Sequence, residues 1–183
     1  MTVDLLERAI GYALGSVVHV TPQFMTRATP CQGWNLDTLL RHVNCSMAAL
    51  QEGVQTGYVG AVSGDIARGA DPVDDFRSGA SRLLGAWTAS GVCAQGITIV
   101  DRPLAAGIVA DAGAIEIAVH AWDISRACRR PSPIPPRLAG DLLELSTLLV
   151  TTDTRQLLFG RPVAISPLAG PSDRLVAYLG RTP

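Results

Sequence analysis

Glu116 and His120 stand four residues apart in a mostly apolar stretch, residues 115–125. Side chains at this spacing are neighbours on one face of an α-helix, with roughly 5–6 Å between their Cβ atoms. The flanking apolar residues leave few positions for a solvated face, so we expect a mostly buried helix with these two side chains pointing inward. A buried carboxylate beside a buried imidazole needs a partner, which is either a hydrogen-bonding residue or a metal ion.

A third candidate ligand, His42, lies far upstream in another predicted helix. If the two helices are neighbours at one level, His42, Glu116 and His120 form a set of two imidazoles and one carboxylate. This set occurs in catalytic zinc sites and leaves coordination positions open for water or substrate. Iron, nickel and manganese accept the same ligands, so ligand type does not identify the metal. The alternative is a pair of hydrogen-bonded structural residues, because Glu and His occur at this spacing by chance in many helices.

Two nearby residues bear on this hypothesis. Cys45 lies three positions after His42. It is either a fourth ligand, which would make the site a closed structural one, or a small buried residue, which we favour. Asp123 lies three positions after His120. It either orients His120 through the outer ring nitrogen or pairs with Arg126, and we slightly favour the pair with Arg126.

The composition limits the class of protein. The chain has 183 residues, a formal net charge of −1 and a pI near 6.3. We expect one domain over residues 1–183, since this length suits a single domain. We do not expect it to bind nucleic acid, because the chain has no net positive charge that would attract phosphates. The first residues are acidic where a signal peptide would be basic, and no window approaches about eighteen apolar residues. A soluble, cytoplasmic protein that does not enter a membrane, with reduced cysteines, is therefore expected.

Apolar residues recur at spacings of three and four in several segments, which is the pattern of amphipathic helices. The helices predicted in this way cover residues 4–18, 36–55 with Asn35 as N-cap, 72–90, 104–128 and 137–152, and a short helix at 172–179 capped by Ser172. Residues 57–70 are predicted to form a loop.

Residues 97–100 are β-branched and are predicted to form an extended crossover, because no second strand of matching length is found. The predicted fold is therefore all-α: a four-helix bundle with one long crossover and an additional C-terminal helix. An irregular tail with a short helix follows over about residues 153–183.

Several motifs together resemble a known family. They are Thr-Pro-Cys-x-Gly-Trp at 29–34, Leu-Leu-x-His-Val at 39–43, Glu-x-x-x-His-x-Trp-Asp at 116–123, Phe-Gly at 159–160 and Asp-Arg-Leu-x-Ala-Tyr-Leu-Gly-Arg at 173–181. This combination resembles actinobacterial DinB-like proteins, and more closely the N-terminal domain group of mycothiol-dependent maleylpyruvate isomerase. The resemblance extends over essentially the whole chain and implies a DinB-like four-helix bundle.

The resemblance also implies a site and a chemistry. Proteins of this group hold a divalent metal, usually zinc, through positions that match His42, Glu116 and His120. A low-molecular-weight thiol such as mycothiol binds the metal as thiolate in this family and attacks an electrophilic substrate, which implies a transferase or an isomerase. Arg41 and Arg126 are then candidates for holding carboxylates of the thiol or of the substrate.

The isomerase in question has a second, C-terminal domain that extends beyond the length of this chain. We therefore do not carry over maleylpyruvate itself as the substrate. The alternative function is a non-catalytic helical bundle that binds a metal or a small molecule, such as a stress-related or regulatory protein. A homodimer is expected on general grounds for such bundles.

Overall fold

The computed structural model of the chain describes residues 2–60, 71–89, 96–151, 155 and 159–183. Its helices are α1 (Thr2–Val17), the short 3-10 helix η1 (Pro22–Phe24), α2 (Leu36–Thr56), α3 (Pro72–Ala89), α4 (Ala106–Ala127), α5 (Pro136–Leu149) and α7 (Pro171–Tyr178). Its strands are β1 (Tyr58–Val59), β2 (Gly96–Ile99) and β3 (Arg102–Ala105). The predicted helices are confirmed with shifts of a few residues at their ends, and the ends predicted at residues 90 and 152 lie outside the described residues.

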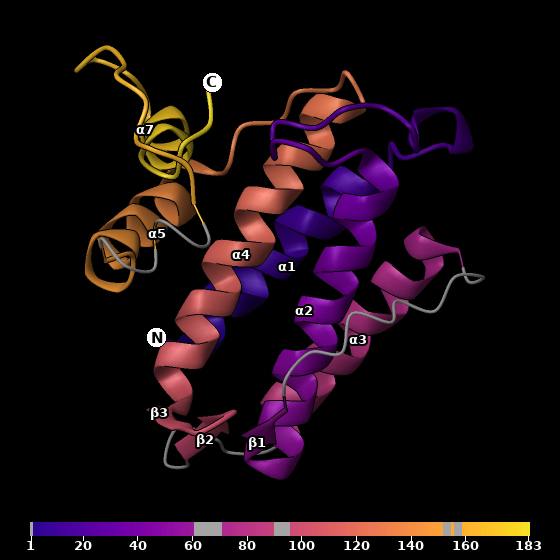
Figure 1. Cartoon of the computed structure of the whole chain (residues 1–183), viewed down its shortest axis with the longest axis vertical. Helices are drawn as coiled ribbons and strands as arrows, with labels where there is room; N and C mark the ends of the chain where they lie inside the picture. The colour runs from indigo at the N-terminus through magenta and orange to yellow at the C-terminus, as the bar shows by residue number, and fades with distance from the viewer. Residues whose placement is uncertain (1, 61–70, 90–95, 152–154, 156–158) are drawn as a thin grey trace.

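Four helices, α1 to α4, pack around one apolar core (Figure 1). α4 packs against α1 and α2, and α3 completes the ring by packing against both α2 and α1. This arrangement explains why α4 is apolar on almost every face, since a helix with neighbours on most sides has little solvated surface. α5 and α7 pack against each other beside this ring. Within the described ranges, no helix combines the length and the apolar character needed to cross a membrane.

A small three-stranded sheet corrects the prediction of an all-α fold. β2 and β3 form an antiparallel pair with Thr98 opposite Pro103, and β1 pairs in parallel with β2. The crossover predicted at 97–100 was wrong because β3 does not look like a strand: it reads Arg-Pro-Leu-Ala, with low strand propensity. Proline is tolerated there because β3 is an edge strand of the sheet. β1 falls within the predicted loop at 57–70, and positions 61–70 of that loop lie outside the described residues.

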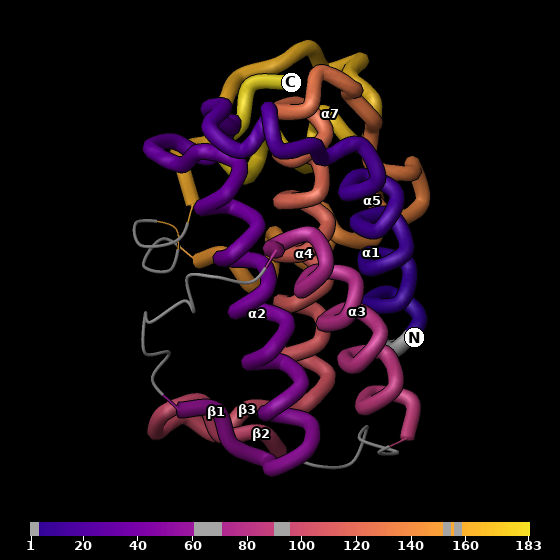
Figure 2. Tube along the Cα trace, turned by 90° about the vertical axis from the view of Figure 1, so that its right-hand side faces the viewer, coloured from indigo at the N-terminus to yellow at the C-terminus, as the bar shows by residue number. Residues whose placement is uncertain are grey.

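The loop before α2 and the C-terminal segment lie together at the end of the bundle opposite the sheet (Figure 2). Asn35 caps α2 as predicted, because its side-chain oxygen accepts a hydrogen bond from the Thr38 amide at 2.9 Å. Ser172 does not cap α7, which has Gly170 as its N-cap. The Ser172 hydroxyl instead accepts a hydrogen bond from the Ile134 amide at 3.0 Å. This bond ties α7 to the segment before α5.

Two glycines fix the course of the C-terminal segment. Gly180 has a left-handed φ of 87°, and a Cβ atom added there would lie 2.5 Å from the Cα of Gly160. The two backbones can therefore approach only because neither residue has a side chain. Arg155 links the same two backbone segments, since its Nη1 donates to the Gly160 carbonyl at 3.1 Å and to the Tyr178 carbonyl at 2.8 Å.

Candidate metal centre

The structure brings His42 from α2 together with Glu116 and His120 from α4. The Nε2 atom of His42 lies 2.5 Å from Oε1 of Glu116, and Nε2 of His120 lies 3.3 Å from the same oxygen. One ligand atom from each of the three side chains lies within 4.8 Å of the others. Zinc holds imidazole nitrogens and carboxylate oxygens at about 2.0–2.2 Å, so donors on one ion are about 3–4 Å apart. The cluster can therefore hold a metal ion, and its donor types do not identify which one.

The charges of these side chains are strongly coupled. Burial alone would raise the pKa of Glu116, but the charge of His120 and hydrogen bonds from both imidazoles lower it far below its ordinary value. Burial alone would lower the pKa of His120, but Glu116 and then Asp123 favour the charged form and raise it to about 9. A cation at this position is thus stabilised by Glu116, whether it is a proton on imidazole or a metal ion.

The second ring nitrogen of His120 is also held. Its Nδ1 lies 3.0 Å from Oδ2 of Asp123, a fully buried carboxylate. An ionised carboxylate can only accept, so Nδ1 donates and Nε2 is left facing Glu116. Histidine ligands of metals are typically held in this way by a carboxylate. The contact between Asp123 and His120 is thus one that a metal site can use.

The pairing that we favoured between Asp123 and Arg126 is wrong. Arg126 is exposed, and its guanidinium carbon lies 5.2 Å from the ring centroid of Trp122. The cation beside Asp123 is Arg181, whose Nη2 donates to Oδ2 at 3.0 Å. The other alternative, that Asp123 contacts the outer nitrogen of His120, agrees with the structure.

A cleft of about 510 Å³ opens over the ligands. The loop before α2 forms one wall with Cys31 and Trp34, and the C-terminal segment forms the other with Phe159 and Arg181. The Trp34 ring centroid lies 4.6 Å from that of His42 and 6.1 Å from that of His120. A molecule the size of a small thiol or substrate can therefore reach the ligand atoms from solvent.

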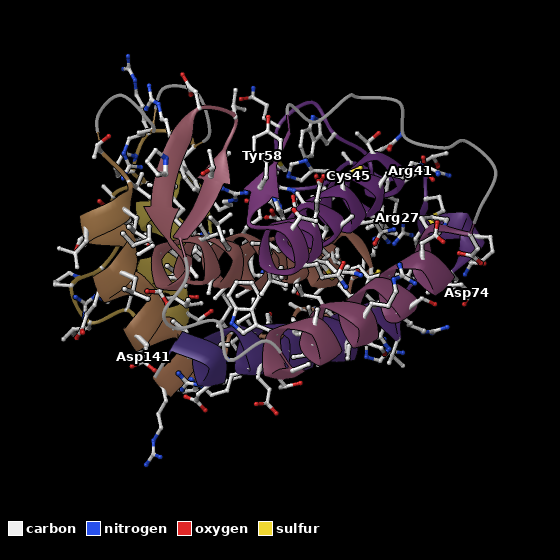
Figure 3. All side chains as sticks on the ribbon, turned by 90° about the horizontal axis from the view of Figure 1, so that it is seen from below. Arg27, Arg41, Cys45, Tyr58, Asp74 and Asp141 are labelled. Atoms are coloured by element: carbon white, nitrogen blue, oxygen red, sulfur yellow. The ribbon has the colours of Figure 1, made fainter. Side chains whose placement is uncertain are left out.

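The remaining predicted site residues lie elsewhere. Arg41 is on α2 beside His42, but its Nε donates to the Asp37 carboxylate at 3.0 Å. Neither Arg41 nor Arg126 is among the described residues that line the cleft, so their role in holding a thiol or substrate stays a prediction. Cys45, labelled with Arg41 on α2 in Figure 3, is half-buried and does not belong to the ligand cluster formed by the described residues.

Sequence reasoning did not single out three residues that the structure places at the site. Trp34, Arg181 and Cys31 were noted only as parts of motifs. Burial raises the pKa of the Cys31 thiol. The spacing of Arg181 gave no signal, because it lies 58 positions after Asp123. The available hint in the sequence was the motif at 173–181, which ends on Arg181.

Comparison with known proteins identifies the bundle. The family model described as the mycothiol maleylpyruvate isomerase N-terminal domain matches residues 7–125. That range contains the three candidate ligands and Asp123, and it ends before α5. The C-terminal segment therefore lies outside the matched range, although residues 159–160 and 179–181 of it line the cleft. Neither the curated proteins nor the solved structures give a match.

Proposed function

From the chain's membership of the mycothiol maleylpyruvate isomerase N-terminal domain family, a DinB-like group, we propose that it is a metal-dependent enzyme whose nucleophile is a low-molecular-weight thiol. Mycothiol is the thiol that the family description suggests. The observation that carries the proposal is the cluster of His42, Glu116 and His120 at the base of an open cleft. Catalytic zinc sites commonly combine three protein ligands of these types with an open coordination position.

A divalent metal ion, zinc or another that accepts these ligands, would supply the Lewis acidity that lowers the pKa of a thiol toward neutrality. The protein's own residues would then have three tasks. His42, Glu116 and His120 hold the ion, Asp123 keeps the Nδ1 proton of His120 in place, and Trp34 limits access of water to the two imidazoles.

The electrophile would enter from the open side of the cleft. The thiolate sulfur forms a bond to an electrophilic carbon of the substrate. In a transferase the leaving group departs with its electron pair and the sulfur stays attached. In an isomerase the sulfur adds to a double bond, rotation follows, and the same C–S bond breaks again. The family description names an isomerase, and transfer is the other outcome of the same attack.

Openness of the site favours an enzyme over a non-catalytic metal-binding bundle. Structural zinc sites are almost always closed by four protein ligands. Here the described residues offer three clustered ligands, and the cleft leads directly to them. The non-catalytic bundle is the alternative that the experiment must separate.

The test compares the wild-type protein with Glu116→Gln and a matched control, Glu144→Gln, at an exposed position of α5. Elemental analysis of the purified proteins should give near-stoichiometric metal in the wild type and control, and little in Glu116→Gln. Millimolar mycothiol should raise the melting temperature of the two metal-loaded proteins, because a ligand of the native state stabilises it. Both should also conjugate the thiol to a chromogenic aryl halide.

Two outcomes would contradict the proposal. Stoichiometric metal without any thermal shift or conjugation at millimolar thiol would assign the protein to the non-catalytic alternative. Equal and negligible metal in all three proteins would make the cluster a hydrogen-bonded structural feature.

A further inference from the structure

We propose that Arg181 is a positioning residue for the metal centre, acting on His120 through Asp123. The inference rests on the proposed function in one respect, namely that a metal ion binds His120. It assigns a task to a residue of the C-terminal segment, which lies outside the range matched by the family model.

The contacts form a continuous chain from Arg181 to the ligand. Arg181 is 7% exposed and Asp123 is 0% exposed. Nη2 of Arg181 donates to Oδ2 of Asp123 at 3.0 Å, and Nε lies 3.5 Å from Oδ1. Oδ2 also accepts the hydrogen bond from Nδ1 of His120 at 3.0 Å. One carboxylate oxygen is thus shared by a guanidinium and the imidazole of a candidate ligand.

Arg181 is the cation that satisfies the buried Asp123 carboxylate. A buried carboxylate that loses its partner carries a large desolvation cost, and its side chain moves toward another donor or toward water. This movement would weaken its hold on Nδ1 of His120. The imidazole would then be free to turn away from the orientation in which Nε2 faces Glu116.

The position of Arg181 is itself fixed by the fold. Its backbone amide donates to the Val176 carbonyl at 2.9 Å, and its Nη1 donates to the Leu179 carbonyl at 3.0 Å. The residue before it is Gly180, which is held against Gly160 by the close backbone contact. The guanidinium is therefore preorganised toward Asp123, and little side-chain freedom remains to be lost when the metal binds.

The experiment measures metal affinity rather than activity. Four variants are compared with the wild type: Arg181→Met, Asp123→Asn, the double variant, and Arg174→Met as a control at an exposed position of α7. Zinc affinity is measured by competition with a chromophoric chelator, and the absorption spectrum of the cobalt-loaded protein reports ligand geometry. Far-UV circular dichroism and melting of the metal-free protein report folding.

We expect zinc affinity to fall about 10–100-fold in Arg181→Met, the range typical for residues that orient metal ligands, with a changed cobalt spectrum. The double variant should melt closer to the wild type than Arg181→Met does, because it no longer buries an unpaired charge, yet its zinc affinity should stay low. This recovery of stability without recovery of affinity separates positioning from support of the fold. Arg174→Met should match the wild type in every measurement.

An unchanged zinc affinity and cobalt spectrum in Arg181→Met, with only a lower melting temperature, would overturn the proposal. If Arg181→Met fails to fold, the double variant decides: wild-type affinity in that protein overturns the proposal, and weak binding supports it. Absence of binding of any divalent metal by the wild type would overturn the proposed function as well as this inference, whereas equal zinc binding in all proteins overturns this inference alone.

Discussion

At the scale of residues, His120 lies between two carboxylates on its own helix. Its Nε2 faces Glu116 at 3.3 Å and its Nδ1 faces Asp123 at 3.0 Å. The two acids differ in their second partner. Glu116 also contacts the imidazole of His42, and Asp123 also contacts the guanidinium of Arg181. Each carboxylate is therefore contacted from a different part of the chain, and the His120 ring is held at both nitrogens.

Tyr12 offers a residue-scale prediction away from the metal centre. Its hydroxyl donates to the Ser132 carbonyl at 2.6 Å, which ties α1 to the segment after α4, and burial raises its pKa from 10.0 to about 12. Since the unfolded chain releases this proton first, the stabilisation is complete below about pH 10 and is lost as the pH rises toward 12. Tyr12→Phe should therefore lower the free energy of unfolding by about 0.5–1.5 kcal/mol at neutral pH.

Urea denaturation at neutral pH and at several values between pH 10 and 12 checks this prediction. The difference between wild type and Tyr12→Phe should shrink as the pH rises. Tyr58→Phe, at a position that is 47% exposed, is the control for general effects of tyrosine ionisation. A difference that stays constant over the whole range would show that the hydroxyl proton does not carry the stabilisation.

Among single residues, the cluster of His42, Glu116 and His120 could be predicted from the sequence, whereas the cation beside Asp123 could not. Glu116 and His120 share a helix, so their spacing alone makes them neighbours. The structure places His42 beside them, as expected if the two helices pack at one level. The partner of Asp123 was misassigned because Arg126 has the same helical spacing, whereas Arg181 reaches it only through the tertiary fold.

At the scale of elements, close packing of α2 on α4 brings the ligands together. A Cβ atom added to Gly113 of α4 would lie 2.6 Å from Cδ1 of Leu50 on α2. Gly113 lies less than one helical turn before Glu116, and Leu50 lies about two turns after His42, so this close approach is beside the cluster, toward the far end of α2. Helical periodicity predicted both helices, but the sheet was missed because β1 spans two residues and β3 contains Pro103.

The C-terminal segment gives the element-scale prediction. Gly180→Ala places a Cβ atom against the backbone of Gly160 and forces a left-handed φ on alanine, which costs about 1–2 kcal/mol for the backbone alone. The segment should move away from the cleft and carry Arg181 with it. We expect a lower melting temperature together with weaker zinc binding, measured by calorimetry and chelator competition.

Gly140→Ala is the matched control, because a Cβ atom at this glycine of α5 meets nothing within 4 Å. Its melting temperature should equal or exceed that of the wild type, since alanine favours a helix. If Gly180→Ala were as stable as Gly140→Ala and bound zinc as tightly as the wild type, the contact between Gly160 and Gly180 would have no part in holding the site.

At the scale of the whole molecule, we expect the apolar core to be independent of any metal bound at the candidate centre. The ring of α1 to α4 buries large side chains along its length, all of them 0% exposed: Leu6, Ile10, Leu39, Phe76, Leu83 and Ile117. The candidate ligands lie at one end of the bundle, beside the cleft, so the core should fold without an ion. This differs from small zinc-dependent domains, in which metal binding supplies the folding free energy.

Removal of the metal should therefore lower stability without unfolding the protein. With free zinc at one hundred times its dissociation constant, binding adds about 2.7 kcal/mol to the free energy of unfolding. A domain of this size changes its melting temperature by about 2–4 °C per kcal/mol, so a strong chelator should lower it by roughly 5–11 °C. Far-UV circular dichroism at 25 °C should stay unchanged, and Glu116→Gln should show no chelator effect. Loss of helical signal on chelation would mean that the ion supports the fold, which would favour a structural site over the open, catalytic one.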